Sequence, residues 1–194
     1  IISLGGKVMF AKGQKSSKGI TNGSIKNEGP LSITLQSVSI NLPRLAFESN
    51  KDETYFRARL ALLMKPALDA MALRKQNISD ITRRGLNPIL ARNTQYMQKS
   101  SVSLVVNLVG LKEAVFNILG FKDNRDGRAI LHKVIETAVD VGSKKGKELG
   151  ETVVISMTKT EGSARFVLLD NQKYGKNSAL NSMDTDVYSE GMSI

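Results

Sequence analysis

Hydrophobic positions along the chain form short β-branched runs that alternate with longer stretches of helical spacing. The apolar runs predict three strands, over residues 33–40, 101–109 and 153–157. Helical spacing predicts a long helix over residues 51–75 and another over residues 128–149. The order of strand, helix, strand, helix, strand, helix predicts an α/β fold. Its strands should be largely parallel, with burial on both faces.

Local signals mark the ends of several of these elements. Pro43 suits the first turn of a short helix over residues 44–49. Asn50 followed by Glu53 resembles a capping box at the start of the long helix, and Pro66 predicts a kink or a break inside it. Residues 84–88 predict a turn.

The second half of the chain has its own boundary signals. Residues 111–120 should form a short helix and residues 122–127 a polar link. The tail, residues 174–194, is polar and offers few core residues. We therefore expect little of the core to come from the tail.

The first 32 residues differ from the rest of the chain, because Gly, Ser, Lys and Asn surround one short apolar island at residues 8–10. This composition predicts a short strand followed by a mobile loop. We divide the chain into a mobile Gly/Lys-rich region, residues 1–32, and a single α/β domain, residues 33–194.

Composition excludes several kinds of chemistry. The 194 residues include no cysteine and one histidine, so disulfides, thiolate metal sites, thiol nucleophiles and multi-histidine metal sites are excluded within them. His132 falls just outside the apolar arc of its helix and is expected to be exposed. Neither a membrane span nor a signal peptide is apparent, which favours a cytoplasmic protein.

A net charge of +10 and a pI of 9.8 favour anionic partners, either nucleotides or nucleic acid. Aromatic residues make up only 5% of the chain and are not interleaved with the basic residues. A stacking platform for single-stranded nucleic acid is therefore poorly supported, and a nucleotide is the favoured partner.

The strand at residues 153–157 runs through a small-residue turn into a segment that can open a helix. In α/β proteins, ligands bind beyond the carboxyl ends of strands, and free N–H groups at a helix N-terminus favour phosphate. The turn supplies five candidate phosphate-binding residues: Thr158, Lys159, Thr160, Gly162 and Ser163. The same residue types also serve as ordinary helix caps, so both interpretations stay open.

Three segments, in order, resemble motifs of the anaerobic, oxygen-sensitive ribonucleoside-triphosphate reductases. Residues 39–46 (SINLPRLA) are similar to the family's INLPR signature, and residues 103–114 (SLVVNLVGLKEA) to its strand with a VGLNEA segment. Residues 158–161 (TKTE) resemble its TPAE turn, with Lys159 in place of proline. The ordered set covers residues 30–192 and indicates an archaeal-type member, in the C-terminal part of the catalytic barrel.

The resemblance implies a half-barrel of largely parallel strands with flanking helices. It also implies radical reduction of ribonucleoside triphosphates, in which a glycyl radical generates a thiyl radical on a cysteine. An S-adenosylmethionine iron–sulfur activase installs the glycyl radical in this family. The turn matching residues 158–163 would hold the substrate phosphates, and Asn41, Arg44 and Asn107 become candidates for lining the barrel.

The departures from the family pattern bear on activity. Without cysteine, neither the thiyl radical nor the family's zinc site can form within these residues, and the glycyl-radical motif is absent from them. Two interpretations follow: part of a full reductase, or a truncated, non-catalytic relative. Either would bind a nucleoside triphosphate and pair with the remainder of a reductase or with a second copy. A basic nucleic-acid-binding protein is the alternative from another class.

The three candidates for lining the barrel also have structural interpretations that involve no ligand. Asn41 could cap the short helix that follows it, and Arg44 could pair with a carboxylate instead of a phosphate. Asn107 is equally ambiguous, and no catalytic residue is assigned.

Overall fold

A computed structural model describes residues 10–11, 32–87, 102–120, 125–158, 162–175, 180 and 186–190 of the chain. The mobile loop expected over residues 1–32 lies outside these ranges, apart from the short strand β1 (Phe10–Ala11). The division at residue 32 therefore stays a prediction. Among the described residues, no helix is both long and apolar enough to cross a membrane.

The centre of the fold is a four-stranded sheet in the order β1-β2-β3-β4. Its longer strands are β2 (Ser32–Asn41), β3 (Val102–Val109) and β4 (Thr152–Ser156), which are parallel to one another, while β1 is antiparallel to β2. The predicted α/β class and the three predicted parallel strands are confirmed. β3 is central and buried along its whole length, as its apolar run predicts.

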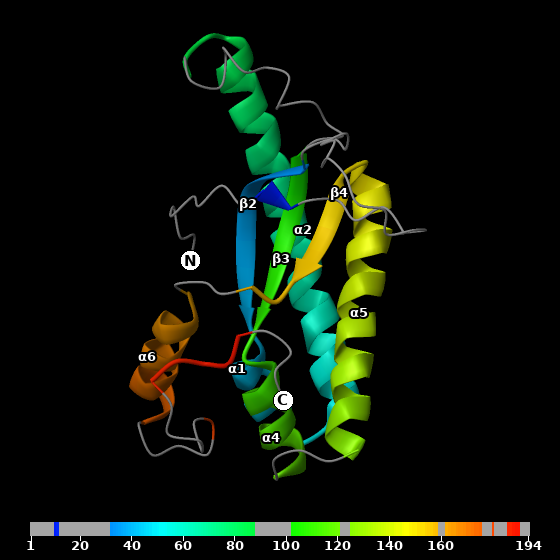
Figure 1. The fold of residues 1–194 in the computed structure, drawn as a ribbon, viewed down its shortest axis with the longest axis vertical. Helices are drawn as coiled ribbons and strands as arrows, with labels where there is room; N and C mark the ends of the chain where they lie inside the picture. The colour runs from blue at the N-terminus through cyan, green and yellow to red at the C-terminus, as the bar shows by residue number, and fades with distance from the viewer. Residues whose placement is uncertain are drawn as a thin grey trace, which may run out of the picture.

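Two long helices, α2 (Glu53–Arg83) and α5 (Arg125–Leu149), pack on the same face of the sheet (Figure 1). Alternate residues of the strands point into the core between sheet and helices. The buried members from β3 and α2 are Leu104, Val106, Leu108, Phe56, Leu60, Met64, Leu68 and Met71, and those from α5 are Ile130, Leu131, Val134 and Ala138. This apolar layer fixes the sheet on its helices, and a smaller cluster of Val109, Val167, Leu180 and Tyr188 lies between β3, α6 and the tail.

Three shorter helices lie at the carboxyl ends of the parallel strands (Figure 1). α1 (Leu42–Glu48) follows β2 directly, α4 (Leu111–Leu119) follows β3 after one residue, and α6 (Gly162–Tyr174) comes after β4. These junctions gather at one end of the molecule. Ligands of parallel α/β sheets bind at this end.

The long helix differs from its prediction at both ends and in its middle. α2 is one unbroken helix of 31 residues with Pro66 inside it, so of the two predicted outcomes, a kink or a break, the break is wrong. Met64 and Leu68 are fully buried on either side of the exposed proline, and their burial offsets the hydrogen bond that proline removes. The predicted capping box is also wrong: Asp52 is the N-cap, through its contact with the Tyr55 N–H, while Asn50 adopts a positive φ of 51°.

Three predictions from the second half of the chain are also corrected. The polar link over 122–127 is shorter than predicted, because α5 already begins at Arg125. β4 is an edge strand with Val154 41% exposed, so it is not buried on both faces. The tail contributes two fully buried residues, Leu180 and Tyr188, although its polar composition predicts few.

A buried ion pair closes the other end of the sheet. Lys75 of α2 donates to the Glu151 carboxylate at 2.5 Å and to the Val102 carbonyl at 3.0 Å, linking α2 to the starts of β3 and β4. The Lys75 side chain is only 9% exposed, so its charge depends on these partners.

Lys75→Met should lower the free energy of unfolding by about 2 kcal/mol, because it leaves the Glu151 carboxylate and the Val102 carbonyl without this donor. Urea denaturation measures the change. Lys144→Met is the matched control, because Lys144 is 80% exposed and pairs only loosely with Asp140. It should change stability by less than about 0.5 kcal/mol. Equal midpoints for the two variants would contradict the role given to Lys75.

Candidate functional site

The face of the sheet opposite α2 and α5 carries a row of small polar side chains. Ser39, Asn107 and Ser156 are register partners across β2, β3 and β4. Alternation along each strand places them on the side away from the core residues Val106 and Ile155. The row lies next to the carboxyl ends of the strands, where the phosphate turn is predicted.

Asn107 fixes the backbone where β4 ends. Its side-chain oxygen accepts from the Thr158 N–H at 2.9 Å, and its side-chain nitrogen donates to the Thr158 carbonyl at 3.1 Å. Asn107 is 1% exposed, so both ends of a buried amide are satisfied by one backbone unit. The central strand thereby sets the direction in which the chain leaves β4 toward α6.

Ser163 is the second residue of α6, and its hydroxyl is a further polar group of the predicted turn that the structure describes. It is 2% exposed, and its hydroxyl donates to the Glu190 carboxylate at 2.5 Å. A carboxylate is thus held near the N-terminus of α6, where the partial positive charge of a helix favours an anion. Of the predicted phosphate-binding residues, Thr158, Gly162 and Ser163 are described, and Lys159 and Thr160 lie outside the described residues.

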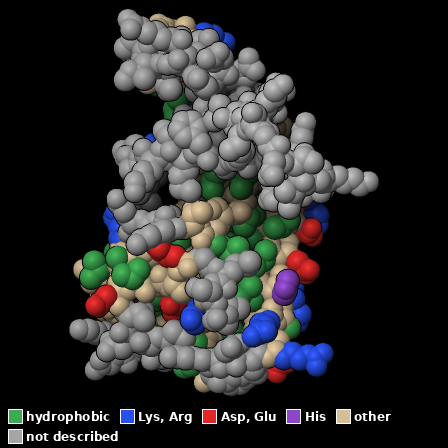
Figure 2. All heavy atoms as spheres, in the orientation of Figure 1, with side chains coloured by type: hydrophobic (Ala, Val, Ile, Leu, Met, Phe, Trp, Pro, Cys, Tyr) green, Lys and Arg blue, Asp and Glu red, His purple; other side chains and the backbone are tan. Residues whose placement is uncertain are grey.

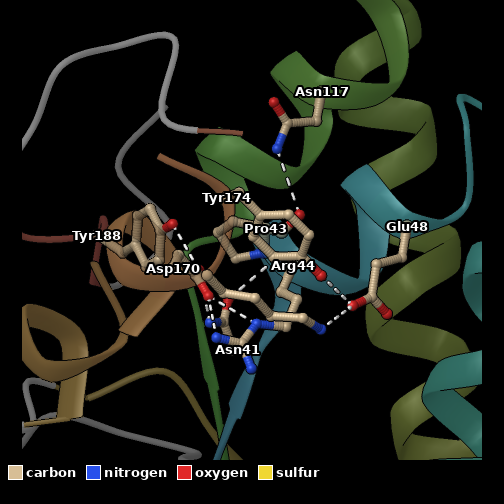
Figure 3. A network of polar contacts seen from close by, with 9 residues as sticks. Asn41, Pro43, Arg44, Glu48, Asn117, Asp170, Tyr174 and Tyr188 are labelled. Atoms are coloured by element: carbon tan, nitrogen blue, oxygen red, sulfur yellow. Dashed lines mark hydrogen bonds and ion pairs between the residues drawn. The ribbon is translucent and has the colours of Figure 1, made fainter. Parts of the chain in front are cut away.

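A second polar cluster, which we call the Asp170 cluster, joins α6 to the β2–α1 junction and to the tail (Figure 3). It consists of Asp170, Asn41, Arg44 and Tyr188. Asp170 is fully buried; one carboxylate oxygen accepts from Asn41 Nδ2 at 2.8 Å and from the Tyr188 hydroxyl at 2.7 Å, and the other from Arg44 Nε at 2.6 Å. A second guanidinium nitrogen of Arg44 also pairs with the carboxylate. Burial and the adjacent Asp170 carboxylate raise the pKa of Tyr188, which keeps its hydroxyl a donor.

This cluster shows the structural contacts that Asn41 and Arg44 make. Asn41 is the N-cap of α1, because its side-chain oxygen accepts from the Arg44 N–H at 3.1 Å. Arg44 pairs with a carboxylate, that of Asp170 on α6. Both side chains are therefore engaged in holding elements together, and their contact with a ligand stays a prediction.

The residues Asp186–Glu190, which we call the C-terminal segment, are fastened to the β3–α4 junction through Ser189. Its carbonyl accepts from the Gly110 N–H at 2.9 Å, and its own N–H and hydroxyl donate to the Glu113 carboxylate at 2.9 and 2.6 Å. The Ser189 hydroxyl also accepts from the Lys112 N–H at 3.3 Å. Glu113 is 4% exposed, so the segment satisfies a carboxylate that would otherwise be buried alone.

The far end of α6 is held by another carboxylate. Glu48 of α1 accepts from the Tyr174 hydroxyl at 2.5 Å and from Lys173 at 3.3 Å, and it pairs with Arg59 of α2 at 2.6 Å. Burial alone would raise the pKa of Glu48, but the hydrogen bonds from Tyr174, Arg59 and Lys173 outweigh it and lower this pKa. The C-terminal part of α6 is thus anchored to α1.

Sequence patterns did not find the acidic residues that organise this end of the molecule. Asp170 and Glu190 lie in an ordinary helix and tail context, and Asn41 and its partner Asp170 are 129 positions apart. No local signal announces such pairing. His132 is exposed on α5, as predicted.

No metal site is seen in the part of the chain that the structure describes, and the face shown in Figure 2 carries no broad basic surface. No group of three or more His, Cys, Asp or Glu residues in that part could hold a metal ion. On the face shown in Figure 2, the described Lys and Arg side chains lie singly or in small groups near the margins, beside apolar side chains over the middle. A groove of ≈ 500 Å³ lies between α5 and β4, lined by Gly142, Gly146 and Val153 among others, away from the predicted turn.

A parallel α/β sheet with a strand–turn–helix junction at its carboxyl end defines a class of protein that binds ligands at that junction. The family model for anaerobic ribonucleoside-triphosphate reductase matches residues 5–193. The chain belongs to the anaerobic ribonucleoside-triphosphate reductase family. A comparison with curated proteins finds no match.

Solved structures of the anaerobic ribonucleotide reductase from Thermotoga maritima have the same fold over this part. The structure with citrate in the active site is 22% identical with a TM-score of 0.71, over 80% of this chain and 29% of that chain. The complex with dATP and CTP is 21% identical with a TM-score of 0.71, over 80% of this chain and 26% of that chain. The structure with glycerol in the active site is 19% identical with a TM-score of 0.71, over 87% of this chain and 28% of that chain. The chain therefore spans less than a third of these structures.

Proposed function

We propose that this chain supplies the substrate-phosphate turn of an anaerobic ribonucleoside-triphosphate reductase of archaeal type, as the C-terminal part of its catalytic barrel. The observation that carries the proposal is the β4–α6 junction, where buried Asn107 fixes Thr158 and Ser163 lies in the first turn of α6, in a chain of this family. The complex of the Thermotoga maritima reductase with dATP and CTP supports a nucleotide as the ligand.

The residues of this chain do not fit the family's radical chemistry. Thiyl formation needs a cysteine, and the chain has none. We propose that these 194 residues bind and position a nucleoside triphosphate but do not reduce it alone. Any reduction would use groups contributed by another part of the protein or by a partner chain.

The intact mass and free-thiol count of the native gene product separate the two forms of this proposal. A product much longer than 194 residues, with thiols, would favour a working reductase. A product of this length without thiols would favour a non-catalytic relative that retains the phosphate turn. Residues 33–194 would form its single α/β domain in either case.

Ser163→Ala should weaken nucleoside triphosphate binding about fivefold, because it removes a hydroxyl donor at the start of α6. Thr160→Ala is expected to act in the same direction. Isothermal titration of the native gene product with ATP measures both, and Ser143→Ala on the exposed side of α5 is the control. If neither variant of the turn changes the affinity, the turn is only a helix cap.

The alternative is a basic nucleic-acid-binding protein, which the net charge of +10 favours. A salt titration separates the two functions, because binding to a phosphate backbone weakens steeply with salt. A single triphosphate site should depend less on salt and should prefer ATP to AMP. Binding of single-stranded DNA that falls steeply with salt, without a preference for ATP, would favour the alternative.

A further inference from the structure

The C-terminal segment is held rigidly where it passes α6. Tyr188 is 1% exposed and donates its hydroxyl to Asp170, and Ser189 makes four hydrogen bonds with the backbone and side chains of the β3–α4 junction. Two consecutive anchored residues leave the next residue little freedom. Glu190 is therefore directed to one position.

That position is beside the predicted phosphate turn. The Glu190 carboxylate accepts from the Ser163 hydroxyl at 2.5 Å. A phosphate oxygen bound at the start of α6 would accept a hydrogen bond from the same hydroxyl. The Glu190 carboxylate thus occupies the Ser163 hydroxyl, the donor that the proposed function assigns to a substrate phosphate.

Two anions cannot share this donor without a large electrostatic cost. A phosphate on Ser163 would lie a few ångströms from the carboxylate, where like charges repel strongly because little water separates them. Binding must therefore break the Ser163–Glu190 contact or bring the two negative charges together. Either event lowers the affinity for phosphate.

We propose that Glu190 is a specificity-determining residue, which acts as a built-in competitor for phosphate at the β4–α6 turn. This inference rests on the proposed function, because it concerns the same turn. It goes beyond that function in assigning to a tail residue the control of how strongly phosphate is held. The ligand class it governs is the triphosphate group, independent of the base.

The test compares three proteins, each at the full length of the native gene product. They are the unchanged protein, Glu190→Gln and Asp186→Asn. Glutamine keeps the size of the side chain and an oxygen that can accept from Ser163, so the fold should be preserved. Asp186→Asn removes the same charge from an exposed position in the same segment and controls for general electrostatics. The probes are ATP, inorganic triphosphate and adenosine, titrated calorimetrically.

Glu190→Gln should tighten binding of ATP and of inorganic triphosphate by about tenfold or more, because it removes the competing charge. Adenosine binding should stay unchanged, and Asp186→Asn should stay within about twofold of the unchanged protein. Glu190→Ser, which also removes the carboxylate, should tighten triphosphate binding in the same direction.

Equal affinities for Glu190→Gln and Asp186→Asn, with ATP bound by both, would overturn the competitor role and leave the proposed function standing. Binding of neither ATP nor inorganic triphosphate to any of the proteins would overturn the proposed function and this inference together. Circular dichroism melting curves confirm that each variant is folded before it is titrated.

Discussion

Asp170→Asn is expected to lower the free energy of unfolding by about 3 kcal/mol, because it converts a buried acceptor of four donor groups into a neutral amide. The carboxylate accepts from Asn41, Arg44 and Tyr188 with both of its oxygens. In the variant, an NH2 group must face one set of these donors, and Arg44 loses its counter-charge. Urea denaturation followed by far-UV circular dichroism measures the loss.

Asp140→Asn is the matched control for this variant. Asp140 lies on α5, its side chain is 74% exposed, and its contact with Lys144 is 3.6 Å long. The same chemical change there should alter stability by less than about 0.5 kcal/mol. If the two variants had the same midpoint, the Asp170 cluster would not be holding α6 in place.

The position of Asp170 also connects stability to the proposed ligand site. Asp170 is on α6, while its partners come from the β2–α1 junction and the C-terminal segment. The same segment continues directly to Glu190, whose carboxylate contacts Ser163 at the other end of the helix. Loss of the cluster should therefore loosen both the N-terminus of α6 and the competitor that lies on it.

The sequence predicts the central sheet because each strand carries its own signal. Residues 101–109 form a continuous apolar run, and the structure buries β3 from end to end. Their alternation with amphipathic helices predicts the parallel order, which is confirmed. These features are local, so no knowledge of distant contacts is required to find them.

The candidate site could be predicted only in part, because its polar contacts join distant segments. The strand–turn–helix at residues 152–166 is evident in the sequence, and α6 does follow β4 there. The partners of that turn are not evident: Asn107 is 51 positions from Thr158, and Glu190 is 27 positions from Ser163. A tyrosine in a polar tail gives no sign that it will be buried, yet Tyr188 is.

Gly110→Ala is expected to lower the free energy of unfolding by about 4 kcal/mol, as the sum of two costs of similar size. Gly110 has φ +78°, a conformation that L residues with a side chain rarely adopt. A Cβ at this position would also lie 2.5 Å from Pro43 Cδ and 3.4 Å from Tyr188 Cβ. Pro43 is fixed in the first turn of α1, so it cannot move aside cheaply.

Gly120→Ala separates the two costs, because Gly120 has nearly the same φ, +79°, and no atom of the described residues lies within 4 Å of the added Cβ. It should cost only about 1–2 kcal/mol, the price of the left-handed conformation alone. The difference between the two variants then measures how tightly α1 and the C-terminal segment pack on the β3–α4 junction. Because the added Cβ would crowd Tyr188 and shift the backbone N–H that donates to Ser189, Gly110→Ala should displace the C-terminal segment and Gly120→Ala should not. Limited proteolysis within residues 186–190 would detect that displacement, and equal stability and equal cleavage of the two variants would contradict the close packing.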